Sequence, residues 1–131
     1  MAYLMPDGSG AQFEVLGFVG AKAGQELQSL VAANALSVGL TLRSGLVALD
    51  ITIIRAMPLS WSEAKRDQME TCFLEGQLGV GNVVAAVCAG LRGIAYVRVT
   101  QIVQLTVRKL WGLEHVVEID LRYISKEATD V

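Results

Sequence analysis

The chain has 131 residues, of which 53% are hydrophobic and 18% are charged, and its formal net charge is −2 at pH 7. This length suits a single core, so we expect residues 1–131 to form one domain with flexible ends over 1–10 and 125–131. Because there is no basic excess to neutralise phosphates, the composition argues against nucleic acid as a partner. The low charged share leaves apolar surface for other subunits to cover, and it predicts a homo-oligomer such as a dimer.

Targeting signals and membrane spans are not expected. The N-terminus has no basic region before Pro6, which excludes a signal peptide. The longest uncharged runs, 27–42 and 76–91, are shorter than a membrane span requires. Cys72 and Cys88 are too few for a disulfide framework and indicate reduced thiols. We therefore expect a protein of the cytoplasm, or of a particle assembled there, that is not secreted.

In chain order, residues 11–19 are rich in β-forming side chains and predict a first strand. Residues 23–38 carry apolar side chains at helical spacing, and Gly39 is placed to end that helix. From Leu46 to Ala56, β-branched and apolar residues alternate with polar ones, which predicts a second strand. The first half of the chain is thus strand, helix, strand.

Two helices are expected next. Ser60 and Glu63 form a capping-box pattern, so a helix should begin at Trp61. Asn82 can cap a second, short and almost wholly apolar helix. The glycine-rich stretch 76–81 precedes that helix, where amides can hold an anion, but it follows a helix and not a strand, which favours a flexible junction. The helix that begins at Trp61 should turn these side chains toward the core: Trp61, Ala64, Met69, Cys72 and Phe73.

The C-terminal third alternates apolar and polar residues over 94–110 and again over 115–124, around a short loop that contains Gly112. This pattern predicts a long C-terminal β-hairpin with one buried face. A first strand of that length would extend about 55 Å, so it must bend near Gln101 or project beyond its own domain. A projecting arm would need a partner.

The alternation also restricts the register of such a hairpin. Keeping the apolar faces together would pair Val107 with Val117 or Ile119. One of these two registers places Arg108 opposite Glu118, in a charge ladder on the polar face. The expected fold class is therefore α+β, a four-stranded mixed or antiparallel sheet with about three helices packed on one face and the long C-terminal β-hairpin.

The candidate functional residues fall into two groups. Trp111 at the hairpin tip is a candidate interface anchor, because Trp is enriched at binding hot spots. The full candidate interface consists of Trp111, Val103, Leu105, Ile102 and Tyr96. If the chain is an enzyme, the candidate acids or bases are Asp50, His115 and Glu118.

Metal and thiol chemistry have little support in the sequence. His115 is the only histidine, and it stands among scattered carboxylates with no ligand spacing, so we expect no metal and no cofactor. Cys72 and Cys88 lie at apolar helical positions, where a thiol packs as a small hydrophobe and does not serve as a nucleophile.

No family motif is identified, and no catalytic constellation. The leading hypothesis is a non-catalytic, self-associating structural subunit, an assembly component of a virion or other protein shell that contacts further subunits of that particle. One alternative is a small oligomeric enzyme whose pocket forms between subunits. Another is a module that binds a small ligand or nucleic acid through Lys65, Arg66 and the hairpin arginines.

Overall fold

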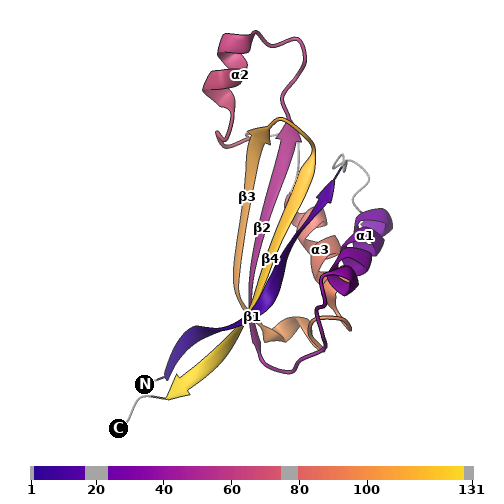
Figure 1. Ribbon diagram of the computed structural model, residues 1–131, viewed down its shortest axis with the longest axis vertical. Helices are drawn as coiled ribbons and strands as arrows, with labels where there is room; N and C mark the ends of the chain where they lie inside the picture. The colour runs from indigo at the N-terminus through magenta and orange to yellow at the C-terminus, as the bar shows by residue number, and fades with distance from the viewer. Residues whose placement is uncertain (1, 17–23, 75–79, 129–131) are drawn as a thin grey trace.

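A computed structural model describes residues 2–16, 24–74 and 80–128. They form a mixed sheet, three α-helices and one short 3-10 helix (Figure 1). In chain order the elements are β1 (Ala2–Leu16), α1 (Gly24–Ser37), β2 (Leu46–Ala56), α2 (Glu63–Met69), α3 (Val80–Leu91), the 3-10 helix η2 (Val99–Gln101), β3 (Ile102–Gly112) and β4 (Val116–Ala128).

The sheet has the strand order β1-β4-β2-β3. β4 runs antiparallel to both of its neighbours, β1 and β2, whereas β2 and β3 are parallel. Ile51 at the middle of β2 pairs with Ile119 of β4 on one side and with Val107 of β3 on the other. Strands β1 and β3 are therefore the two edges of the sheet.

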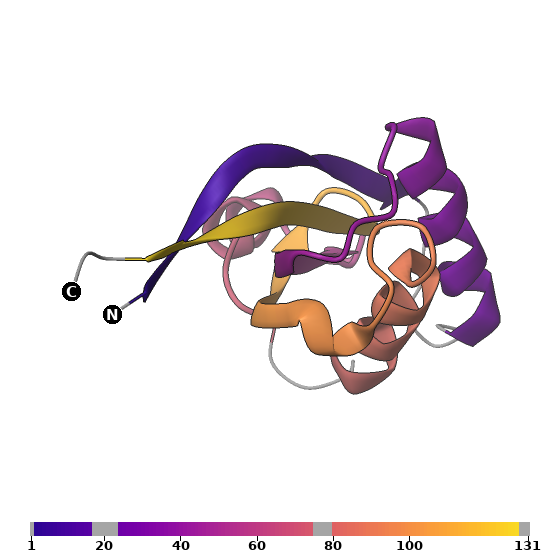
Figure 2. The ribbon, with the colours of Figure 1, turned by 90° about the horizontal axis from the view of Figure 1, so that it is seen from below.

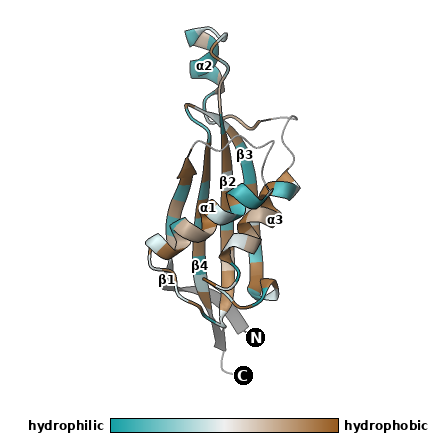
Figure 3. Ribbon diagram, turned by 90° about the vertical axis from the view of Figure 1, so that its right-hand side faces the viewer, coloured by the Kyte–Doolittle hydropathy of each residue, from teal (hydrophilic) through white to brown (hydrophobic). Residues whose placement is uncertain are grey.

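Helices α1 and α3 cover one face of the sheet and leave the other face open (Figure 2). Leu27, Val31 and Ala35 recur at helical spacing on α1 and are fully buried. They join the main core with the apolar side of the central strands, including Leu49 and Ile51. The hydropathy colouring shows brown strand positions beneath the two helices (Figure 3). None of the helices in the described ranges has the length and hydropathy of a membrane span.

The predicted α+β class and four-stranded mixed sheet are confirmed. The two C-terminal strands of the predicted hairpin are also present, and they run in opposite directions around the short turn 113–115. However, β2 lies between them, so the predicted pairing of Val107 with Val117 or Ile119, and of Arg108 with Glu118, is wrong. Three residues can bridge the two strand spacings, about 9.6 Å, that separate β3 from β4.

The C-terminal strand predicted over 94–110 is shorter than expected, because the chain turns at Gln101 and β3 begins at Ile102. The Gln101 side-chain oxygen accepts hydrogen bonds from the backbone amides of Val97 (2.8 Å) and Arg98 (2.9 Å). Its side-chain nitrogen donates to the carbonyl oxygens of Arg43 (2.9 Å) and Gly45 (2.8 Å). Gln101, a polar residue on the predicted apolar face, therefore ties the turn to the start of β2, and the chain does not project beyond the domain there.

Helix α2 differs most from its prediction. Its N-cap is Ser62, whose hydroxyl accepts from the Lys65 amide at 3.2 Å, and not Ser60. The Trp61 amide instead bonds to the Pro58 carbonyl at 3.1 Å, which places a turn before the helix and delays its start. α2 buries none of its residues and lies beyond the end of the sheet, away from the face that α1 and α3 cover (Figure 1). Phe73, predicted to face the core, is 77% exposed.

The strands at the two ends of the chain are longer than predicted. Residues 2–10, predicted as a flexible end, belong to β1, and β4 continues to Ala128. Residues 75–79, which hold most of the glycine-rich junction, lie outside the described residues. α3 is present as predicted, although it begins at Val80, before Asn82.

The contact between α1 and α3 yields a test of the core. A Cβ atom added at Gly90 of α3 would lie 2.6 Å from the Gln28 carbonyl oxygen of α1. We expect Gly90→Val to lower the free energy of unfolding by about 2 kcal/mol, because the two helices must move apart. Gly81→Val on the same helix meets no atom within 4 Å and should change stability by only a few tenths of a kcal/mol. Urea denaturation compares the two, and equal stabilities would contradict the close packing.

Candidate functional site

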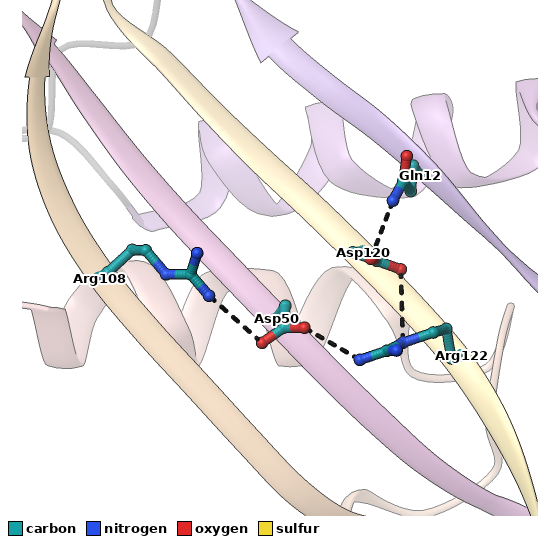
Figure 4. A network of polar contacts seen from close by, with 5 residues as sticks. All are labelled: Gln12, Asp50, Arg108, Asp120 and Arg122. Atoms are coloured by element: carbon teal, nitrogen blue, oxygen red, sulfur yellow. Dashed lines mark hydrogen bonds and ion pairs between the residues drawn. The ribbon is translucent and has the colours of Figure 1, made fainter. Parts of the chain in front are cut away.

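The open face of the sheet, which is the face turned away from α1 and α3, carries a network of charged side chains centred on Asp50 of β2 (Figure 4). Arg122 of β4 donates a hydrogen bond to Asp50 Oδ2 at 3.2 Å. Arg108 of β3 approaches Asp50 Oδ1 at 3.8 Å. The Asp50 side chain is 26% exposed, so its charge is partly shielded from water and is balanced by two guanidinium groups.

Asp120 of β4 lies directly opposite Asp50 in the sheet. Two carboxylates at facing positions repel each other. Gln12 of β1 donates to Asp120 Oδ2 at 2.9 Å, and Arg122 Nε lies 3.9 Å from Asp120 Oδ1. Arg122 therefore contacts both acids and offsets their repulsion, which explains how the pair is tolerated.

Gln12, Asp50, Arg108 and Asp120 line a groove of about 610 Å³ on the open face. Glu118 lies in the same groove, opposite Thr52 on one side and Glu14 on the other. The sheet thus brings together two of the three predicted acid or base residues, Asp50 and Glu118. Glu118 does not have the predicted pairing with Arg108, because β2 separates their strands.

His115, the third predicted acid or base, lies elsewhere. Its Nδ1 atom accepts a hydrogen bond from the Ala56 amide at 3.3 Å, just beyond the end of β3. The proton of the neutral ring is therefore on Nε2. His115 lines a second cavity and is not among the residues of the open-face groove.

We call this second hollow the end cavity. It has a volume of about 610 Å³ and lies where β2 and β3 end and the segment that carries α2 begins. Its lining consists of Arg55, Ala56, Met57, Pro58, Leu59, Trp61, Arg66, Trp111, Leu113 and His115. The rings of Trp61 and Trp111 lie 4.9 Å apart, and Lys65 Nζ lies 4.4 Å from the Trp61 ring centre. Cationic and aromatic side chains therefore gather at this end of the sheet.

The predicted interface residues divide into two sets. Tyr96 is fully buried in its own chain, where its hydroxyl donates to the Cys88 carbonyl at 2.5 Å. Trp111 is only 8% exposed, because it packs in a small second core with Met57 and Leu74. In contrast, Val103 and Leu105 are 45% and 46% exposed on edge strand β3, beside the half-buried Ile102.

The two thiols also differ from each other. Burial raises the pKa of the Cys88 thiol, which keeps it protonated and suits its predicted role as a small packed side chain. Cys72 is exposed, contrary to its predicted core position, and its Sγ donates to the Gln68 carbonyl at 3.3 Å. The environment of Cys88 therefore does not favour a nucleophilic thiolate.

Sequence reasoning missed Arg55 and the full role of Trp61 in the end cavity. Arg55 of β2 is paired with Trp111 in the parallel β2–β3 register. These residues are far apart in sequence, and no local sequence pattern predicts that they lie side by side. The available signal in the sequence was Trp61 close to Lys65 and Arg66 just after a strand, which by itself indicates only a local basic patch.

Comparison with known proteins shows the family of this chain. The chain matches the family described as endodeoxyribonuclease RusA over residues 21–122, more than three quarters of its length. No curated protein and no solved structure matches it. An endodeoxyribonuclease cleaves DNA, so the match contradicts the leading hypothesis of a structural subunit of a virion or shell, and it contradicts the expectation that nucleic acid is not a partner. The chain belongs to the endodeoxyribonuclease RusA family.

Proposed function

We propose that this chain acts on DNA, and that it does so as a homo-oligomer. The observation that carries the proposal is the family match over residues 21–122, which begins before α1 and ends within β4. That stretch contains the whole lining of the end cavity. It also contains the lining of the open-face groove apart from the β1 residues. The family match favours both alternatives drawn from the sequence, an oligomeric enzyme and a nucleic-acid binding module. We propose that this chain combines the two and works in the cytoplasm.

The distribution of charge supports DNA as the partner despite the net charge of −2. Residues 76–113, which contain α3, η2 and β3, hold no Asp or Glu. The same stretch has four basic residues: Arg92, Arg98, Arg108 and Lys109. This stretch of the chain therefore has a local excess of basic residues, of which Arg108 is paired with Asp50, and a local excess of positive charge attracts phosphates.

Hydrolysis by nucleases commonly uses divalent cations held by clustered carboxylates. Asp50 and Asp120 do not fit such a site, because Arg122 is already in contact with both acids and Arg108 approaches Asp50. Within the described ranges, no three His, Cys, Asp or Glu side chains gather as ligands. We assign no hydrolytic step to these carboxylates, and the proposal concerns recognition of DNA and assembly of the subunits.

Self-association is best supported at edge strand β3. Its far end is covered by the segment after α2, since the Leu74 amide bonds to the Lys109 carbonyl and the Trp111 amide to the Cys72 carbonyl. Toward its start, the apolar side chains of Val103 and Leu105 are about half exposed. Uncovered edges with apolar side chains pair readily with another strand. A second copy of β3 is the partner that we propose.

The first prediction of this proposal concerns DNA binding. We expect the protein to bind labelled duplex DNA with an affinity that falls by roughly 40-fold between 50 and 200 mM salt, the response for about three phosphate contacts. Fluorescence anisotropy of the DNA measures it. An absence of binding at low salt, or an affinity that does not respond to salt, would contradict the proposal.

The second prediction concerns Asp50, the predicted acid or base. Asp50→Asn should lower the free energy of unfolding by about 1 kcal/mol, because the charged partner of Arg122 is lost. DNA affinity, and any DNA cleavage, should stay within twofold of the unmodified protein. Asp67→Asn on the exposed surface of α2 is the matched control for stability. Loss of cleavage without loss of stability would show that Asp50 is catalytic and not structural.

The third prediction concerns the subunit contact. Leu105→Lys should convert the oligomer to a monomer, because it places a charge in an apolar strand edge. Leu16→Lys on the opposite edge strand β1, where Leu16 is 63% exposed, should leave the oligomer intact. Sedimentation velocity measures both masses. If Leu105→Lys keeps the mass of the oligomer, the contact lies elsewhere.

A further inference from the structure

The end cavity is built by the parallel pairing of β2 with β3. Arg55 lies beside Trp111 in this register, and the next pair is Ala56 with Gly112. A Cβ atom at position 112 would lie 2.3 Å from Ile54 Cγ2, so glycine permits the close approach of the two strands. The Met57 amide then bonds to the Gly112 carbonyl at 3.0 Å. The end of the sheet is thus fixed where the cavity opens.

The two tryptophans form an aromatic wall of this cavity. Trp111 is nearly buried against Met57 and Leu74, while Trp61 packs on the outside of this small core and is half-buried. Their ring planes are tilted by 60°. Lys65 already lies over the Trp61 ring, which shows that the ring accepts a cation at its face. The part of the Trp61 indole that remains accessible is a surface on which a nucleobase can stack.

The charged lining of the end cavity has one sign. Its charged residues are Arg55 and Arg66, His115 adds a polar ring, and no Asp or Glu lines it. His115 presents a ring N–H as a donor, because its other nitrogen accepts from Ala56. A neighbouring hollow of about 400 Å³ shares Trp61 and Arg66 but is lined by three acids, Glu63, Asp67 and Glu70. An anion is therefore directed to one side of Trp61, and guanidinium groups bind phosphate with good geometry.

We propose that the end cavity binds one unpaired nucleotide of a DNA strand, with its base against Trp61 and its phosphate held between Arg55 and Arg66. The volume of about 610 Å³ lies within the usual range of ligand pockets. The nucleotide is unpaired because a base inside a duplex offers no free face for stacking. This inference rests on the proposed action on DNA and adds the position where a strand is held.

The chain offers a direct probe, because its only two tryptophans both line this cavity. Titration with a short oligothymidylate should quench the intrinsic tryptophan emission. Arg66→Gln should weaken this binding by about tenfold, and Arg66→Lys should restore part of it. Asp67→Asn, one residue along and facing the acidic hollow, should not weaken it. Trp111→Phe leaves Trp61 as the sole reporter, and its emission should still be quenched.

The unfolding midpoint of each variant shows whether it folds, so a loss of binding is counted only for variants that match the parent protein. The inference is overturned if labelled DNA binds by anisotropy while tryptophan emission stays unchanged and Arg66→Gln has no effect; the proposed action on DNA then stands. It is also overturned if inorganic phosphate at the same phosphate concentration displaces the oligonucleotide fully, since the base would then contribute nothing. If no DNA binds in either assay, both proposals fail together.

Discussion

The position of β2 in the sheet is the constraint on which the rest of the structure depends. β2 pairs along its length with β4 on one side and with β3 on the other. A parallel pair requires a long crossover, and the chain between β2 and β3 supplies it with α2, α3 and η2. This arrangement seats α3 against α1 over the core, places Asp50 between two arginines, and sets Arg55 beside Trp111.

Individual elements were predictable because they follow from local periodicity. Leu46–Ala56 was predicted with the bounds that β2 has, and α1 lies within one residue of its prediction at each end. Alternation shows which face of a strand is buried, but it does not show which strand lies beside it. The two C-terminal strands, which are neighbours in the sequence, were therefore predicted to pair with each other. The turn 113–115 is short enough to indicate a two-strand hairpin and just long enough to cross β2. Gln101 was noticed as irregular, yet its hydrogen bonds to Arg43 and Gly45 are long-range and leave no mark in the sequence.

The site was less predictable than the fold. Asp50 and Glu118 were selected and do share a groove, but the arginines that balance Asp50 come from two other strands. The end cavity joins Arg55, Arg66 and Trp111 only through the parallel register. The net charge was also misleading, because it averages an acid-free stretch of 38 residues, 76–113, with an acidic remainder. Counting charges by segment would have shown this basic stretch and given more weight to the nucleic-acid alternative.

We therefore propose a family member in which ion pairs hold the open face together, one strand edge pairs with a second copy, and the end cavity binds DNA. The position of the DNA site is the central proposal. The most direct measurement is ¹⁵N chemical-shift mapping during titration with DNA. We expect the largest shifts at the indole N–H groups of Trp61 and Trp111 and at the Arg66 amide, and shifts confined to α1 or to the Asp50 network would contradict the proposal.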